Sequence, residues 1–174
     1  AYHTEIGDLL LCALGLAVKD WTGSGKIVVE FEGHGREALH RPLAIDRTVG
    51  WFTSLYPVSL ELEEELPASI IGVKEAIRQV PNRGIGYGLL REDSDGALPD
   101  ARTWISFNYL GQMDAGEKGE SLFTRSELPK GMDISPKNRF NELVVNGGVS
   151  NDRLTLEAAG NGNRWTREDM DRFC

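Results

Sequence analysis

The segment from residue 26 to residue 32, K-I-V-V-E-F-E, constrains the fold of this chain most strongly, because polar and apolar side chains alternate along it. A period of two is typical of a half-buried β-strand. It places three apolar side chains on one face and Glu30 and Glu32 on the other. A sheet built from such strands has one apolar face, which must be buried against another layer.

Glu32 also opens the run E-G-H-G-R-E at residues 32–37. Gly33 and Gly35 leave the backbone of this turn open to close approach. A carboxylate at the C-terminal end of a strand, beside such a turn, is suited to act as a general acid or base. The alternative is a strand-end glutamate that simply faces water. Glu32 is therefore the first candidate catalytic residue.

The rest of the chain alternates between helical and strand patterns. Helices are predicted over residues 5–20, 67–80 and 167–173, the first capped by Thr4 and the last by Thr166 with Asp169. The apolar stripe of the first helix is predicted as Ile6, Leu9, Leu10, Ala13, Leu16 and Ala17. Strands are predicted over residues 26–32, 49–56 (bounded by Pro57), 103–110, 142–149 and 153–159. Residues 82–88 are predicted as a turn and 92–102 as a surface loop. This order predicts an α/β fold with an open mixed sheet covered by helices.

Composition limits the classes of function. With 174 residues, 40% of them hydrophobic, the chain is expected to form one domain or lobe. A formal charge of −8 and a pI near 4.9 argue against nucleic acid or an anionic membrane as partner. No apolar run approaches the roughly 20 residues that span a bilayer, so a cytoplasmic location is predicted. Cys12 and Cys174 form no metal signature and are expected to be reduced thiols.

Five short motifs follow one another along the chain. They are T-E-I with D-L-L-L at residues 4–11, E-G-H-G-R-E at 32–37, R-T-V-G-W-F-T-S-L-Y-P at 47–57, P-N-R-G-I-G-Y-G at 81–88 and F-N-Y-L-G-Q at 107–112. In sequence and order they resemble the motifs of epimerization domains of non-ribosomal peptide synthetases. The sister condensation domains share the fold, but the versions at residues 51–53 and 107–112 resemble the epimerising branch.

The resemblance implies a fold and a domain organisation. Residues 1–174 are expected to form the C-terminal lobe of a chloramphenicol-acetyltransferase-like fold. The family carries a His-His-x-x-x-Asp-Gly motif in its N-terminal lobe, whereas this chain has only His3, His34 and His40, none of them adjacent. The N-terminal lobe is therefore expected to be absent from this chain. Residues 116–139 are interpreted as the latch that crosses between lobes.

The resemblance also implies the chemistry. The expected reaction is L-to-D epimerization of an aminoacyl or peptidyl thioester, with Glu32 and a histidine of the other lobe as the two proton-handling groups. Tyr109 is predicted as a further catalytic residue and Asn108 as a substrate-binding residue. Because neighbours on a regular strand point to opposite faces, only one of this pair can face the site unless the strand is bulged or ends there. Tyr109 is preferred, with a core aromatic as the alternative.

Other motif residues receive lesser roles. Trp51, Gly86 and Tyr87 are assigned to substrate binding, with packing as the alternative for Trp51. His34 is interpreted as structural. Arg36 is expected to pair with a carboxylate or to hold its loop.

The same resemblance implies the partners. No cofactor or metal is expected, and the substrate arrives on the 4′-phosphopantetheine arm of a peptidyl carrier protein. The other expected partner is the N-terminal lobe. Two alternatives remain, a condensation lobe that forms peptide bonds and a non-catalytic lobe that docks a carrier protein. Entry of solvent deuterium at the α-carbon separates epimerization from both.

Overall fold

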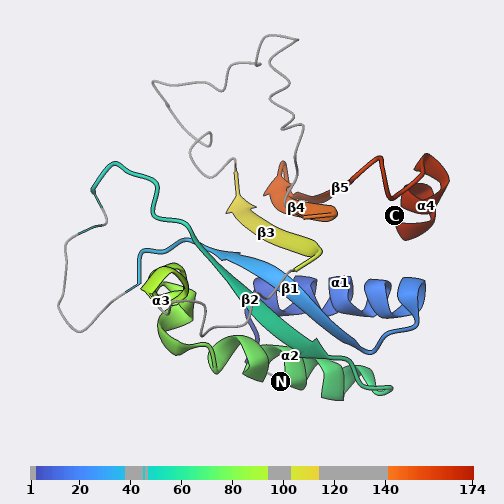
Figure 1. Ribbon diagram of the computed structural model, residues 1–174, viewed down its shortest axis with the longest axis horizontal. Helices are drawn as coiled ribbons and strands as arrows, with labels where there is room; N and C mark the ends of the chain where they lie inside the picture. Colours follow the sequence, from blue (N-terminus) through green and yellow to red (C-terminus); the bar gives the residue numbers. More distant parts are fainter. Residues whose placement is uncertain (1–2, 38–44, 46, 94–102, 114–140) are drawn as a thin grey trace, which may run out of the picture.

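A five-stranded mixed sheet forms the centre of the molecule (Figure 1). The computed structural model describes residues 3–37, 45, 47–93, 103–113 and 141–174. The strand order is β2-β1-β3-β4-β5. The strands are β1 (Lys26–Gly33), β2 (Ser54–Glu61), β3 (Ile105–Gln112), β4 (Leu143–Ser150) and β5 (Arg153–Gly160). β1, β3 and β4 are parallel, and the two edge strands are antiparallel to their neighbours. The predicted open mixed sheet is confirmed.

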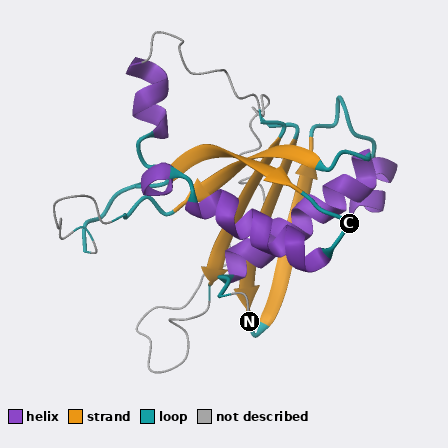
Figure 2. Cartoon of the chain, turned by 90° about the horizontal axis from the view of Figure 1, so that it is seen from below, coloured by secondary structure: helices purple, strands orange, loops and turns teal. Residues whose placement is uncertain are grey.

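Helices cover one face of this sheet (Figures 1 and 2). The helices are α1 (Ile6–Thr22), α2 (Leu66–Arg78), α3 (Tyr87–Asp93) and α4 (Arg167–Phe173), with a 3₁₀ turn η1 (Pro81–Gly84). The core lies between α1, α2 and the sheet, and its fully buried members include Leu11, Val18, Val73, Ile105, Phe107 and Leu143. Within the described ranges, no helix has the length and apolar character that a membrane span requires.

The buried face of α1 differs from the predicted stripe. Leu11, Cys12 and Val18 are buried, whereas Ile6 and Leu9 of the predicted stripe are exposed. The helix is apolar around most of its circumference, so periodicity alone could not select the face that meets the sheet. The helix also begins one residue later than predicted: Glu5 is its N-cap, and the Glu5 backbone N–H donates to Asp8 Oδ2 at 2.9 Å.

The second strand is also displaced from its prediction. β2 begins at Ser54, and Pro57 lies in its middle instead of ending it. The register with β1 continues on both sides of Pro57. Proline is tolerated here because β2 is an edge strand, where the missing N–H faces away from the ladder.

Residues 81–93 contain more helix than expected. The predicted turn contains η1, in which Asn82 and Arg83 adopt positive φ, and it leads directly into α3. The predicted loop at 92–102 therefore begins inside a helix. Residues 94–102 and the interpreted latch at 116–139 lie outside the described residues.

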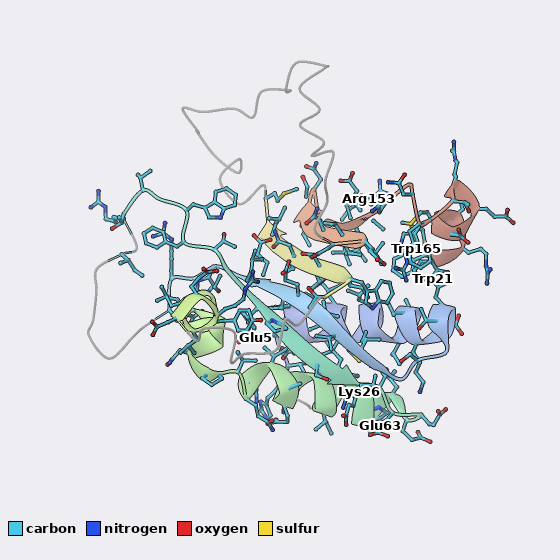
Figure 3. All side chains as sticks on the ribbon, in the orientation of Figure 1. Glu5, Trp21, Lys26, Glu63, Arg153 and Trp165 are labelled. Atoms are coloured by element: carbon cyan, nitrogen blue, oxygen red, sulfur yellow. The ribbon has the colours of Figure 1, made fainter. Side chains whose placement is uncertain are left out.

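The C-terminal part follows the sequence prediction closely. Asn151 and Asp152 take positive φ in the tight turn between β4 and β5. Thr166 and Asp169 form the predicted capping box of α4. Trp165 packs on Trp21 of α1 with ring centroids 4.4 Å apart, which ties this end of the chain to the core layer (Figure 3).

Candidate active site

Glu32 lies near the C-terminal end of β1, on the sheet face opposite α1 and α2. The alternation of β1 decides this, because Ile27 and Val29 are buried in the core and Glu32 occupies the other set of positions. The side chain is half-buried. Partial burial, and then the nearby Glu30 charge, raise the pKa of Glu32 above its ordinary value. A raised pKa makes the ionised carboxylate a stronger base than an ordinary glutamate, which suits it to accept a proton.

The register between β1 and β3 identifies the neighbours of Glu32. Phe31 pairs with Phe107, and the next positions along these two parallel strands are Glu32 and Asn108. Neighbouring residues of a parallel pair share a face, so Asn108 lies beside Glu32 on the face without helices. No hydrogen bond links the Asn108 side chain to another described residue. Its amide is therefore available to a ligand.

Tyr109 lies on the other face. Its ring packs against the hydrophobic core, and it lies over Gly147 of β4, its neighbour in the register. The preference for Tyr109 over Asn108 as the residue beside Glu32 is therefore wrong. The register of β3 with β4 shifts only after Tyr109, at Leu110 and Gly111. This irregularity therefore does not move the Tyr109 side chain to the face of Glu32.

The turn after Glu32 is packed against the loop of residues 47–53. Gly35 has a φ of +65°, and a Cβ at this position would meet the carbonyl oxygen of Phe52. Arg36 donates to the carbonyl oxygens of Ile45 and Thr48 and places its guanidinium 4.2 Å from the Phe52 ring centroid. Arg36 thus holds the loop, as expected. Gly35 permits this packing and does not open the turn to a substrate.

His34 is engaged within the same turn. Its Nδ1 accepts the Arg36 backbone N–H at 3.0 Å, and its Nε2 lies 3.2 Å from Glu37 Oε1. Glu37 also faces Arg83 Nε at 3.7 Å, which connects this turn to η1. Both ring nitrogens therefore have partners, in agreement with the structural role expected for His34.

The remaining predicted site residues lie apart from Glu32. Trp51 is 89% exposed, so it does not pack within the described part of the chain. Gly86 and Tyr87 line a cavity of about 500 Å³ along β2, bordered by the end of α2 and by α3. Glu32 is not among the residues that line this cavity. Of the six predicted site residues, the structure thus brings Glu32 and Asn108 together.

Three further residues of this site received no role from the sequence. Glu30 shares the face of Glu32, and Asn141, just before β4, donates from Nδ2 to Glu30 Oε1 at 2.9 Å. Asn146 of β4 is the register partner of Asn108. The alternation in β1 signalled Glu30. No local signal pointed to the two asparagines, because their placement depends on pairing between distant segments.

Other chemistry finds little support in the described residues. Cys12 is buried in α1, and desolvation raises the pKa of its thiol, which disfavours the reactive thiolate. No group of three or more potential metal ligands occurs among the residues whose positions are described.

Comparison with known proteins defines the class of this domain. The family model described as "Condensation domain" matches residues 1–174. The chain is 47% identical over 167 residues to surfactin synthase subunit 1 of Bacillus subtilis (strain 168), with 91% of the chain covered. It is 48% identical over 145 residues to tyrocidine synthase 2 of Brevibacillus parabrevis, with 79% covered. The chain belongs to the Condensation domain family, in the form found in non-ribosomal peptide synthetases.

Solved structures also match this chain. The epimerization domain from the third module of tyrocidine synthetase B matches with a TM-score of 0.84 and 40% identity, over 99% of this chain and 40% of that chain. The starter condensation domain of rhizomide synthetase matches with a TM-score of 0.62 and 12% identity, over 95% of this chain and 38% of that chain. The second likeness establishes the fold alone. The chain spans 5% and 4% of the length of the two curated relatives.

Proposed function

We propose that this chain is the C-terminal lobe of an epimerization domain, and that Glu32 transfers a proton at the α-carbon of a carrier-bound aminoacyl or peptidyl thioester. The observation that carries the proposal is the half-buried Glu32 carboxyl, its pKa raised, beside the Asn108 amide, which makes no hydrogen bond to another described residue. The higher identity to an epimerization domain than to a condensation domain supports the same branch.

The chemistry follows from the substrate. A thioester acidifies the neighbouring α-carbon, so a carboxylate can accept that proton and leave an enolate. Return of a proton to the opposite face inverts the centre, and this requires a second proton carrier facing Glu32. The Asn108 amide donates a hydrogen bond to the thioester oxygen as negative charge develops on it. No cofactor takes part in this scheme, because the thioester itself stabilises the enolate.

The second proton carrier is expected from an N-terminal lobe outside these 174 residues. The loop of residues 47–53 supports such a partner, because Arg36 fixes its backbone while Val49 and Trp51 are 99% and 89% exposed. A fixed loop with exposed apolar side chains is suited to contact another surface. The other partner is the carrier protein, which delivers the substrate on its phosphopantetheine arm, in the cytoplasm.

Exchange of the α-proton with solvent tests the proposal. The two-lobe domain is incubated in D₂O with an L-aminoacyl carrier protein, and the released amino acid is analysed for deuterium and configuration. Glu32→Gln is expected to lower exchange by about 10²–10⁴-fold, because the amide cannot accept the proton. Glu61→Gln is the matched control, since Glu61 is exposed and pairs with Lys26 at 2.8 Å. If the Glu32→Gln variant exchanges the α-proton at the wild-type rate, Glu32 takes no part in the mechanism.

Two further outcomes distinguish the alternatives. The 174-residue chain alone is expected to give no exchange above the enzyme-free rate, and racemisation by this chain would refute the two-lobe mechanism. Condensation is the second candidate, because the matching family model describes condensation domains. Amide bond formation with a second aminoacyl carrier, without α-deuteration, would favour it.

A further inference from the structure

A polar row crosses the face of the sheet that carries Glu32. Asn108 pairs with Asn146 across β3 and β4, and Asn146 pairs with Glu157 across β4 and β5. At the other end of this row, on the same face, Glu32 of β1 pairs with Leu55 of β2. These residues therefore lie on one line across the sheet, with Glu32 and the two asparagines at its centre.

The two asparagines are placed to bind a ligand. Asn108 and Asn146 are both half-buried, and neither side chain makes a hydrogen bond to another described residue. Neither amide is among the buried side-chain atoms that lack a partner, so both remain open to solvent or to a ligand. The helices α1 and α2 lie on the opposite face (Figure 2), so neither of them satisfies these groups. The row thus presents two adjacent amides, each with one acceptor and two donors.

Spacing relates this row to the substrate. Neighbouring strands lie about 4.8 Å apart, so Asn108 is about 5 Å and Asn146 about 10 Å from the Glu32 position across the sheet. An extended chain advances about 3.3–3.6 Å per residue. When the reacting α-carbon lies at Glu32, Asn108 is near the thioester, and Asn146 is within reach of the next secondary amides of the substrate.

We propose that Asn146 is a substrate-binding residue, which hydrogen-bonds a secondary amide of the carrier-bound substrate beyond the reacting thioester. This inference rests on the proposed function, because the position of the α-carbon is taken from Glu32. Secondary amides flank that carbon on two sides, in the peptidyl chain and in the phosphopantetheine arm. A primary amide complements either one, by donating to its carbonyl and accepting from its N–H.

Four small thioesters distinguish the two sources. Aminoacyl and N-acylated dipeptidyl groups are each attached either to N-acetylcysteamine, which retains the amide of the pantetheine end, or to propanethiol, which lacks it. KM and kcat for α-proton exchange are measured with the two-lobe domain and its Asn146→Ala variant. Ser150→Ala is the control, because Ser150 lies on the same face of β4, four residues from Asn146, and does not line the cavity of Gly86 and Tyr87.

Asn146→Ala is expected to raise KM by about 3–10-fold for the thioesters that carry the recognised amide, with kcat unchanged. It should leave KM unaltered for those that lack it. A KM effect confined to dipeptidyl compounds assigns Asn146 to the peptidyl side, and one confined to N-acetylcysteamine compounds assigns it to the pantetheine side. Equal KM values for wild type and variant with all four compounds would overturn the inference.

The two proposals fail in different ways. Absence of α-proton exchange in the wild-type domain refutes the proposed function but leaves the binding role testable. In that case the same four thioesters are titrated by calorimetry, and the ratio of Kd between Asn146→Ala and wild type takes the place of KM. Denaturant unfolding of the variant verifies that its fold is intact.

Discussion

The two faces of the sheet are built from alternate residues of the same strands, yet they differ in chemistry. On the helix side, Ile105 and Phe107 are fully buried. On the other side, the intervening Ser106 and Asn108 are half-buried and polar. The comparison teaches that one strand both stabilises the fold and supplies the candidate site, because successive side chains point in opposite directions. Substitutions one position apart should therefore separate stability from activity.

The largest expected effect is on the apolar face. Phe107→Ala should lower the free energy of unfolding by about 3–5 kcal/mol, because it removes a fully buried ring and leaves a cavity. Ser106→Ala, one residue earlier and on the other face, should change it by less than about 0.5 kcal/mol. Denaturant unfolding measures both. Equal losses would mean that the two faces do not differ in their contribution to stability.

Next in size is a loss of rate on the polar face. Asn108→Ala should reduce α-proton exchange by about 10²-fold, as when one oxyanion donor is removed, while the free energy of unfolding stays close to that of wild type. Exchange in D₂O and denaturant unfolding are measured on the same preparation. An unchanged rate would exclude Asn108 from the reaction.

A smaller effect is expected on the pH dependence. Partial burial and, after it, the Glu30 carboxylate raise the pKa of Glu32, so Glu30→Gln should lower that pKa while the effect of burial remains. Glu32 then stays ionised, and able to accept a proton, at lower pH. The acidic limb of the exchange rate should therefore move to lower pH. The other charged residues of the strands on this face lie farther from Glu32: Lys26 and Glu61 pair at the opposite ends of β1 and β2, and Arg153 and Glu157 lie on β5, three strands away.

Stability should respond to the same charge. A raised pKa means that folded Glu32 binds protons more readily than unfolded Glu32, so its contribution to stability falls as pH rises through the folded pKa. Glu30→Gln should weaken this fall, and unfolding measured across pH provides the check. A rate profile that moves to higher pH, or does not move, would contradict the assignment of Glu30.

The smallest effect is expected at Tyr109. Tyr109→Phe should change the exchange rate by less than about 3-fold, because its ring packs on the helix side, away from Glu32. Exchange measured beside Asn108→Ala gives a direct comparison of adjacent residues. A decrease of about 10²-fold in the exchange rate, as when an oxyanion donor is removed, would show that Tyr109 takes part in the reaction.

The sequence predicted what depends on local pattern. The alternation of β1 correctly gave the face of Glu32, and the capping pair correctly gave the start of α4. The face of α1 could not be predicted, because that helix is apolar on several sides and tertiary packing selects one. The choice between Asn108 and Tyr109 required the register of β1 with β3, two strands separated by more than seventy residues. Asn146 depends on a second such pairing.

Pro57 has a consequence for how copies of this domain behave beside one another. A sheet edge with a full row of outward N–H groups is a template on which another strand can add, and this is a route to aggregation. Proline within a sheet is found on edge strands such as β2, where the N–H that it lacks would face outward, so the outer row of donors is missing one at Pro57. The edge is therefore interrupted at its middle, and a second chain cannot extend the sheet there with continuous hydrogen bonding. One residue thus protects the domain against polymerisation through this edge.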